Sequence, residues 1–390
     1  MNRVLKSSFI CGLILAGILL SETSSASEQI SQSVVSPCFE CYQVSKEVGS
    51  YRPSSFQKGN TRELQISGFL TQAWSLLEPS CNNDTSFNQT LLEILIQAEP
   101  IENWSFFTAL EWQRQADINF FDPNDPTFRR FTLRVPMLIG WVNWSWKDSF
   151  QVTLGRFVTP HGIINIEQFP PVLLENNQPQ FLRPFSGDTI FPNYLNGVHF
   201  HGTQYLGDKK DSVLLWHAYL ANHTNSLPSK YYAGARLSYT FYNSSMTIGG
   251  NYAYGMRHFW GEPTRLGNMS VTPIESLTSN HFHMAGADLL IDTRCLLWKT
   301  EFFYTWENGY QNRLGFYTQP AWKVSERWII FYRYDWLVPG QRLTSSLEHV
   351  IGVNYLPDPM IRTRFLYFYK EFCDTHDVAH VFQTSITVSF

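Results

Sequence analysis

Two pairs of histidines have the spacing that places two imidazoles on one face of an extended strand. They are His199 with His201 and His281 with His283. Side chains at positions i and i+2 of a strand point to the same side, and imidazoles are common transition-metal ligands. No carboxylate or third histidine stands at a matching spacing. We therefore interpret both pairs as polar residues of a lumen or a membrane interface, and we expect no metal and no cofactor.

A third candidate for chemistry is the C-x-x-C motif of Cys38 and Cys41. Such a pair can be redox-active, can bind a metal ion or can form a disulfide. No second C-x-x-C motif completes a zinc site, and an intramolecular or intermolecular disulfide is the favoured state in an exported chain. Serines and histidines are numerous, but they form no recognisable motif of a nucleophile with its base. We therefore expect a protein that is not an enzyme.

The composition excludes some functions and narrows the class of protein. A formal net charge of -4 gives no strong field with which to bind nucleic acid. Charged residues make up 16% of the chain, below the roughly 25% that is usual in soluble proteins, and aromatic residues make up another 16%. After the N-terminal segment, no apolar run is long enough to span a bilayer as a helix. Such a chain is either a large secreted β domain or a membrane β-barrel.

The N-terminal region differs from the rest of the chain. Residues 1–26 combine a positive start, an apolar run and a small-residue cleavage site that ends at Ala26, which predicts a secretory signal peptide. Residues 27–63 are rich in Ser, Gln, Glu and Lys and do not alternate, so we expect a periplasmic N-terminal extension there. Residues 64–390 are expected to form an outer-membrane β-barrel.

Apolar and polar residues alternate along most of 64–390. At 295–306, for example, Trp298 and Phe302 share one face, while Lys299 and Glu301 share the other. Successive side chains of a strand point to opposite faces, so each such segment is a strand with one apolar face. The pattern predicts sixteen strands, near 64–76, 89–99, 103–115, 129–146, 150–157, 196–206, 211–222, 230–242, 245–255, 279–291, 295–306, 312–324, 327–337, 347–356, 360–371 and 379–390.

The connections between these segments alternate in length. Short ones fall at 147–149 and 292–294, for example, and longer ones at 116–128, 158–195 and 256–278. Trp, Tyr and Phe stand at both ends of most strands. These features are typical of an outer-membrane barrel with periplasmic N- and C-termini. We therefore predict an all-β fold, a transmembrane antiparallel β-barrel of about sixteen strands that turns its apolar face to lipid.

Several short motifs resemble those of a known family. The segment Phe-Gln-Val-Thr-Leu-Gly-Arg-Phe-Val-Thr-Pro-His-Gly at 150–162 resembles the strand that precedes the long third loop in the phosphate-selective porin (O and P type) superfamily. Arg333 to Asp335, the segment 348–355 and the terminal Phe390 look like that family's late strands. The carbohydrate-selective porins are the second resemblance. Both imply a sixteen-stranded porin, and the dense lysine ladder of the true phosphate porins is absent here.

The resemblance also carries expectations about assembly. It implies that Phe390 is a membrane-assembly signal read by the barrel-assembly machinery. It further implies a homotrimer in outer-membrane lipid.

The segment 158–195 is long and lacks alternation, and a structureless connection of that length is usually functional. It follows the fifth predicted strand, where the family resemblance implies a loop that folds into the lumen and narrows it. We expect the constriction to carry the ionisable residues His161, Glu167, Glu175, Arg183 and Asp188. The alternative is a surface loop that covers the barrel mouth.

If the apolar face meets lipid, residues of the opposite parity face the pore. This rule assigns to the lumen the basic residues Arg130, Arg134, Arg236, Lys299, Arg313, Lys323, Arg333, Arg362, Arg364 and Lys370. It also assigns to the lumen the acidic residues Glu93, Glu99, Glu111, Asp288, Glu301 and Asp335. Ten minus six leaves four positive charges, which predicts a weak to moderate preference for anions. The alternative is that the charges pair, for example Lys299 with Glu301 or Arg333 with Asp335, and leave a nearly neutral pore.

The function that best accounts for these patterns is a water-filled channel for passive diffusion of small polar or anionic solutes. The alternatives are a barrel that acts as an adhesin or structural surface protein, and a barrel enzyme.

Overall fold

Strands form most of the chain after residue 63. The computed structural model describes residues 64–78, 85–116, 131–134, 137–167, 169, 173–175, 178–182, 190–207, 212–223, 231–241, 245–257, 280–307, 312–338, 345–373 and 378–390. Every described residue belongs to one compact unit within Pro37–Phe390. Several sequence-based expectations lie outside the described residues, namely the signal peptide 1–26, the extension 27–63, Cys38, Cys41, Arg130, Arg183 and Asp188.

The described chain contains seventeen strands and one short 3-10 helix. The strands are β1 (Leu64–Glu78), β2 (Thr85–Ile101), β3 (Trp104–Ala116), β4 (Phe131–Arg134), β5 (Met137–Lys147), β6 (Phe150–Val158), β7 (Tyr194–Leu206), β8 (Ser212–His223), β9 (Tyr232–Thr240), β10 (Met246–Arg257), β11 (Asn280–Asp292), β12 (Leu296–Glu307), β13 (Arg313–Lys323), β14 (Trp328–Val338), β15 (Ser346–Asp358), β16 (Ile361–Phe372) and β17 (Val378–Ser389). The helix is η2 (Gln180–Leu182).

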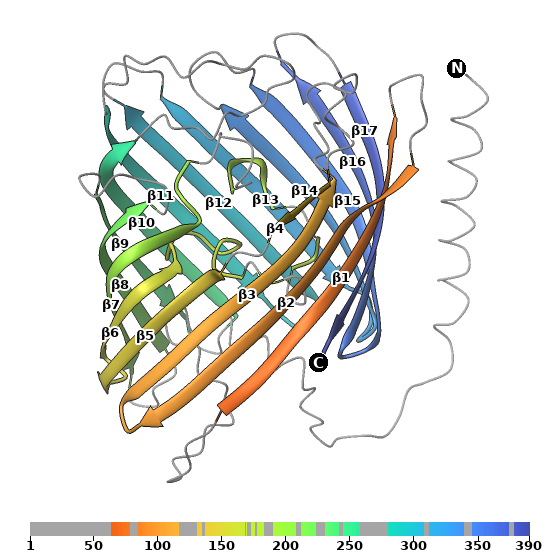
Figure 1. Ribbon diagram of the computed structural model, residues 1–390. Coiled ribbons are helices and arrows are strands. Elements are labelled where there is room, and N and C mark those ends of the chain that lie inside the picture. Colours follow the sequence, from red (N-terminus) through yellow and green to blue (C-terminus); the bar gives the residue numbers. More distant parts are fainter. Residues whose placement is uncertain are drawn as a thin grey trace, which may run out of the picture. The chain divides into compact units, whose positions relative to one another are not determined.

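The sheet closes on itself as an antiparallel barrel (Figure 1). Apart from β4 and β5, each strand pairs with its neighbours in the chain, and β1 pairs with β17 through the partners Phe69 with Ser389 to Glu78 with His380. β3 pairs with β4 along one part of its length and with β5 along another. β4 and β5 therefore occupy one position in the wall, and the barrel has sixteen positions. The pairing of β1 with β17 joins the first and last described strands, as a sheet that crosses a membrane requires.

This arrangement confirms the fold class expected from the sequence. The predicted strand at 89–99 is longer, as β2 (Thr85–Ile101), and the predicted strand at 129–146 appears as the two strands β4 and β5. Pro136 stands between them in the sequence, and a proline has no N–H to give to a ladder of hydrogen bonds.

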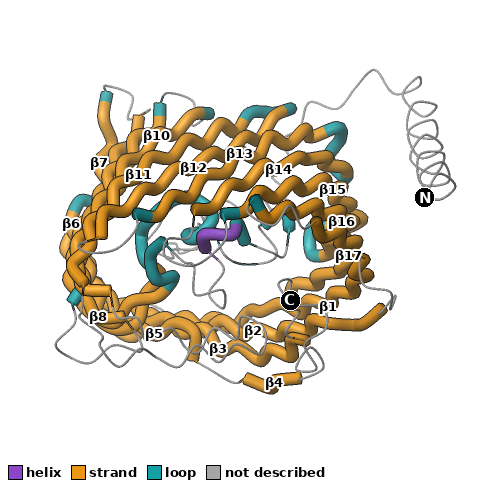
Figure 2. Tube along the Cα trace, turned by 90° about the horizontal axis from the view of Figure 1, so that it is seen from above, coloured by secondary structure: helices purple, strands orange, loops and turns teal. Residues whose placement is uncertain are grey.

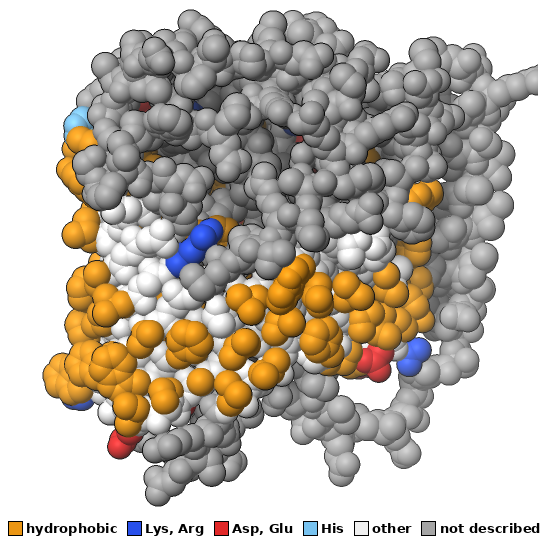
Figure 3. All heavy atoms as spheres, viewed as in Figure 1, with side chains coloured by type: hydrophobic (Ala, Val, Ile, Leu, Met, Phe, Trp, Pro, Cys, Tyr) orange, Lys and Arg blue, Asp and Glu red, His pale blue; other side chains and the backbone are white. Residues whose placement is uncertain are grey.

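The two faces of the wall follow strand parity. On β12, Lys299, Glu301 and Phe303 are buried inside, whereas Trp298 and Phe302 are exposed on the outer face. The same alternation covers the outside with apolar side chains, which form a broad band over the face seen in Figure 3. Among the described residues, no helix has the length and apolar character to cross a membrane.

The inside of the barrel is packed as well as polar. One cluster of buried hydrophobic residues joins Phe157 of β6 to Phe181, Phe191, Phe303 and Tyr317. A second cluster lies along β11 to β17. Most inward side chains of the described wall are buried, because the segment between β6 and β7 lies against them.

Candidate channel interior

The segment between β6 and β7 crosses the inside of the barrel. Figure 2 shows η2 and its flanking loops within the ring of strands. The segment leaves the wall at Val158 and returns at Tyr194, yet its described residues contact β12, β14, β15 and β16. In the ring of sixteen positions, β6 and β14 are eight positions apart, so the loop reaches the opposite wall.

A tight turn at Gly162 fixes the first contact with that wall. Gly162 has φ +70, a left-handed conformation that glycine adopts without a steric penalty. The turn aims the N–H groups of Ile163 and Ile164 at Glu301 Oε1, at 2.9 and 2.8 Å. Tyr317 Oη donates to the same oxygen at 2.6 Å. A Cβ at Gly162 would lie 2.0 Å from Glu301 Oε2, so the approach of the turn to β12 also requires glycine.

Ion pairs make the next contacts. Glu167 of the loop pairs with Lys299 of β12, and Glu175 pairs with Arg333 of β14. Arg333 also contacts Glu348 Oε1 at 2.6 Å and Asp335 Oδ2 at 3.6 Å. The Arg333 side chain has no exposed surface, so three carboxylates neutralise one fully buried guanidinium.

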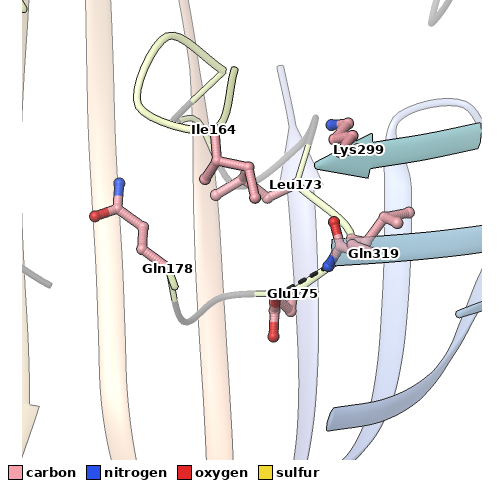
Figure 4. A pocket seen from close by; sticks show the side chains of 7 residues that line it. Ile164, Leu173, Glu175, Gln178, Lys299 and Gln319 are labelled. Atoms are coloured by element: carbon pink, nitrogen blue, oxygen red, sulfur yellow. Dashed lines mark hydrogen bonds between the residues drawn. The ribbon is translucent and has the colours of Figure 1, made fainter. Parts of the chain in front are cut away.

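Backbone groups of the loop complete the attachment. Gln180 N donates to Asp335 Oδ2 at 2.7 Å, and Ser346 Oγ donates to the Gln180 side chain at 2.6 Å. Arg362 Nη1 and Arg364 Nη2 both donate to the Leu173 carbonyl oxygen, at 2.9 and 3.0 Å. A small gap beside Leu173 is lined by Ile164, Glu175, Gln178, Lys299 and Gln319, and it holds no free volume for a water molecule (Figure 4).

Aromatic packing seals the loop against the wall. Phe181 lies 5.6 Å from Phe303 and 6.1 Å from Tyr317, measured between ring centroids. Phe191 meets Phe303 edge-on at 5.0 Å. Burial of such rings stabilises a contact by about 1.5–3 kcal/mol for each side chain. Hydrophobic packing therefore supplements the ion pairs in holding the loop inside.

His161 connects the loop to the wall near β8 and β10. Its Nε2 is 2.7 Å from Tyr219 Oη, and its Nδ1 is 3.3 Å from Asn251 Oδ1. Asn251 Nδ2 donates to Asp288, which also pairs with Arg236 at 2.7 Å. Burial lowers the pKa of His161 from 6.5 to about 3, the hydrogen bond to Asn251 partly opposes that change, and Arg236 adds to it. His161 is therefore neutral while the loop is packed.

The two histidine pairs of the sequence lie on opposite sides of the wall. His199 and His201 face inward on β7, where His199 Nε2 is 3.1 Å from His217 Nδ1 and His201 Nε2 is 3.0 Å from Thr153 Oγ1. His281 and His283 of β11 alternate with the buried Phe282 and therefore face outward. Within the part of the chain that the structure describes, no group of three His, Cys, Asp or Glu residues could hold a metal ion.

The structure places most of the sequence-assigned lumen residues on the inner face. Arg236, Lys299, Glu301, Arg313, Arg333, Asp335, Arg364 and Lys370 are buried there, and Lys323 and Arg362 are partly buried. Arg134 lies on β4, and its side chain is outside the described residues. Of the expected constriction residues, His161, Glu167 and Glu175 meet the wall directly.

Among the inward side chains that the structure describes, acidic residues outnumber basic ones, and Arg130 and Arg134 of the expected surplus lie outside this set. Asp292, Glu307 and Glu348 also lie on the inner face of their strands, although the sequence analysis did not assign them to the lumen. The loop adds two more acidic residues, Glu167 and Glu175. The described interior therefore holds eight basic and eleven acidic side chains, a difference of minus three. These additional acidic residues form ion pairs with basic residues of the lumen. Glu307 pairs with Arg313 at 3.0 Å, and Asp292 pairs with Lys323 at 2.5 Å.

The alternative expectation, that basic and acidic side chains pair inside the barrel, is correct for one of its two examples. Arg333 does meet Asp335, but Lys299 pairs with Glu167 of the loop and not with Glu301. Sequence reasoning also missed Tyr219 and Asn251, which hold the loop by hydrogen bonds, and Tyr317, which donates to Glu301 and stacks on Phe181 of the loop. Strand parity would have placed all three inside, but it does not say which inward residue meets a loop from the opposite wall.

The barrel closes beside Phe390. Gly68 N donates to the Phe390 carbonyl and Phe390 N donates to the Gly68 carbonyl, both at 2.9 Å. The Phe390 ring is 58% exposed on the outer face, and its Cζ would lie 2.7 Å from a Cβ at Gly68. The C-terminal aromatic residue is therefore part of the seam between β1 and β17.

Several solved structures have a similar architecture. The anion-selective porin from Comamonas acidovorans aligns with 85% of this chain and 100% of its own, with a TM-score of 0.57 and 9% identity. OmpT of Vibrio cholerae, described as an outer membrane protein, covers 86% of this chain and 99% of its own, with a TM-score of 0.55 and 9% identity. OmpF of Salmonella typhi covers 84% of this chain and 98% of its own, with a TM-score of 0.51 and 9% identity.

These similarities define a fold, because all the identities are far below those that indicate a shared function. No family model matches the chain, and no curated protein matches it significantly. The fold that the architecture and the neighbours share is a porin-like β-barrel.

Proposed function

We propose that the protein is a porin that lets small polar and anionic solutes diffuse passively across the outer membrane. The observation that carries the proposal is the long loop anchored inside the barrel by Glu301, Arg333, Arg362 and Arg364. A loop held across the lumen restricts what passes through it. An adhesin or structural barrel would use its external loops and gains nothing from such an arrangement. We also propose transport in preference to catalysis.

The proposed ion selectivity is weak. Ion pairs engage Arg236, Lys299, Arg313, Lys323 and Arg333, so their fields are largely cancelled. The contacts of Arg362 and Arg364 include a carbonyl oxygen, Leu173 O, which carries no formal charge. Arg362 and Arg364 lie together on β16 at the loop, and Arg362 is partly exposed, so we propose that this pair attracts anions locally against the acidic side chains of the described interior. A field of this kind is strongest in a narrow, low-dielectric passage.

We further propose the orientation and assembly that porins share, with both termini in the periplasm and three chains in a homotrimer. We also propose that the protein is related to the phosphate-selective porin (O and P type) superfamily, which its sequence motifs resemble. One of the similar solved structures is described as a trimer form of Vibrio cholerae OmpT, at 7% identity. Gentle detergent extraction followed by mass measurement tests this, and a monomer would contradict it.

The test of function is conductance in a planar lipid bilayer. We expect stable single-channel steps and a small reversal potential of anion-selective sign in a salt gradient. Arg362→Ala with Arg364→Ala should move that potential toward zero or toward cations. The matched control is Arg294→Ala with Arg327→Ala, which removes two exposed arginines from short turns outside the lumen and should leave the potential in place.

Absence of any conductance from correctly folded protein would contradict the channel. Conductance with an unchanged reversal potential in the β16 double variant would leave the channel in place but would refute the role of those two arginines.

A further inference from the structure

One arrangement of side chains occurs three times on the outer face of the barrel. In each case a Tyr-x-Tyr sequence on one strand lies beside a histidine of the next strand. We call each unit a tyrosine–histidine clasp. The three clasps are Tyr252, Tyr254 and His283 on β10 and β11; Tyr332, Tyr334 and His349 on β14 and β15; and Tyr367, Tyr369 and His380 on β16 and β17.

The geometry of the clasps is the same. The second tyrosine is the direct cross-strand partner of the histidine, and the two ring centroids lie 4.8, 5.3 and 5.4 Å apart in the three clasps. The hydroxyl of the first tyrosine lies diagonally across the strands from histidine Nδ1, at 2.8, 2.6 and 2.7 Å. His281 has the same kind of contact, with Tyr254 Oη 2.8 Å from its Nδ1.

The clasps all lie at the same end of the barrel. His283, His349 and His380 are each within the first four residues of β11, β15 and β17, and these three strands all begin at the same end of the antiparallel barrel. The neighbours Phe282, Val350 and Val381 are buried inside, so the histidines face outward. His349 also contacts Tyr369 at 5.8 Å, which joins the second and third clasps into one band across β14 to β17.

The hydrogen bonds determine what each clasp offers to its surroundings. We assign the tyrosine hydroxyl as the donor to Nδ1, because a phenol is a stronger acid than the N–H of a neutral imidazole. The neutral imidazole then carries its hydrogen on Nε2. Within the described residues, Nε2 of His283, His349 and His380 has no hydrogen-bond partner. Each clasp is therefore an oriented N–H donor, held by an aromatic support, on a surface that otherwise contacts lipid.

The position of the clasps relative to the membrane indicates which ligand they would meet. The rim of a membrane barrel lies at the level of the lipid headgroups, whose phosphates are strong hydrogen-bond acceptors. Of the described outward-facing residues on β10 to β17, none is Lys or Arg, so imidazoles are the basic groups on this side. One carboxylate is near, since Tyr369 Oη donates to Glu371 at 3.4 Å. That contact makes the third clasp the weakest candidate for an anion.

We propose that the three tyrosine–histidine clasps form a binding surface for the phosphate groups of lipid headgroups at the loop end of the barrel. The inference rests on the barrel being embedded in a membrane, and it does not depend on whether the lumen conducts.

The test is lipid binding by the folded full-length chain in detergent micelles. The probe is bisphosphorylated lipid A, compared with the same lipid after enzymatic removal of its phosphates. We expect the triple variant His283→Phe, His349→Phe, His380→Phe to bind the phosphorylated lipid at least about tenfold more weakly, because each loses a hydrogen bond to a charged group. The triple His→Gln variant, which keeps an N–H donor at a similar distance from the backbone, should recover much of the affinity.

A matched control removes three ring N–H donors from the opposite rim. Trp298, Trp322 and Trp328 face outward near the short turns, and their joint replacement by Phe should leave the affinity unchanged. Heat-dependent migration on a gel establishes that each variant is folded before its binding is measured.

Three outcomes would overturn the proposal. They are equal binding of the two forms of the lipid, unchanged binding by the triple Phe variant, and displacement of the lipid by millimolar inorganic phosphate alone. The last result would indicate a site for the free ion. Loss of conductance with intact lipid binding would contradict the porin and leave the clasps in place.

Discussion

Gly162 shows how much of the loop's position depends on a single residue. Its positive φ and its close approach to Glu301 allow the turn to direct two backbone N–H groups at one carboxylate oxygen. An alanine there would pay about 1–2 kcal/mol for the left-handed conformation and would also clash with Glu301 Oε2. We expect Gly162→Ala to loosen the loop and to give larger and noisier conductance steps, measured in a planar bilayer.

Gly250 provides the control for that variant. It lies on the outer face of β10, and a Cβ added there meets no atom within 4 Å. Gly250→Ala should leave the conductance unchanged. A Gly162→Ala channel indistinguishable from the wild type would mean that the turn does not set the width of the passage.

Arg333 is the residue whose loss should cost the most stability. Without it, Glu175, Asp335 and Glu348 would face one another in a buried site. Removing one partner of a buried charge cluster typically costs about 3–5 kcal/mol. We expect Arg333→Ala to lower the free energy of unfolding by that amount, measured by urea denaturation in lipid vesicles.

The comparison for Arg333 is Lys323, whose side chain is 27% exposed and pairs with Asp292 at the turn end of β13. A pair of this kind contributes about 1 kcal/mol or less. Equal losses for Lys323→Ala and Arg333→Ala would show that burial does not determine the energy of these pairs.

At the scale of elements, the seam between β1 and β17 is the last pairing needed to close the wall. Phe390 gives it two backbone hydrogen bonds with Gly68 and an exposed ring on the outer face. We expect deletion of Phe390, or Phe390→Asp, to lower the amount of barrel in the outer membrane by severalfold, measured by cell fractionation. Phe390→Trp keeps an aromatic residue at the interface and should assemble normally. Normal assembly of the deletion variant would refute the proposed assembly signal.

The strands could be predicted from the sequence because their signal is local. The alternation at 295–306 depends only on which residues meet lipid, and it placed β12 within one residue at each end. The same rule put Lys299, Glu301 and Arg333 inside. The loop could not be derived in this way, because the partners of Glu167 and Glu175 come from strands far away in the sequence.

The clasps were missed for a related reason. The sequence shows Tyr252 and Tyr254 as one alternating pair and His283 as part of another. Only the register of β10 against β11 brings Tyr254 opposite His283, and register depends on the whole turn between the strands.

At the scale of the whole molecule, the packed loop is expected to respond to acid. His161 has its pKa lowered to about 3 in the packed loop, whereas a released loop would return it toward 6.5. Above pH 6.5, His161 is neutral in both the packed and the released loop. Between pH 6.5 and about 3, His161 binds a proton only when the loop is released. The packed state therefore loses stability as the pH falls from about 6.5 toward 3. We expect the open probability or conductance to rise over that range in a planar bilayer.

His161→Gln isolates this effect, because glutamine keeps hydrogen-bonding groups but does not titrate. Arg236, Asp288, His199 and His217 are close enough to influence His161 or to be influenced by it, and they remain in both proteins. The difference between the two pH profiles therefore reports His161. Identical profiles would show that acid acts on the channel through other groups.

The course of the loop from β6 to β14 has a mechanical consequence. A closed wall one sheet thick resists stretching along its hydrogen bonds but is easily flattened into an ellipse. A segment fixed at both ends of a diameter, by the chain itself at Val158 and by Glu175 on Arg333 at the other end, acts as an internal brace against that flattening. Lateral pressure from the bilayer would then be carried by the brace as well as by the wall, so the cross-section should remain the same in membranes of different tension.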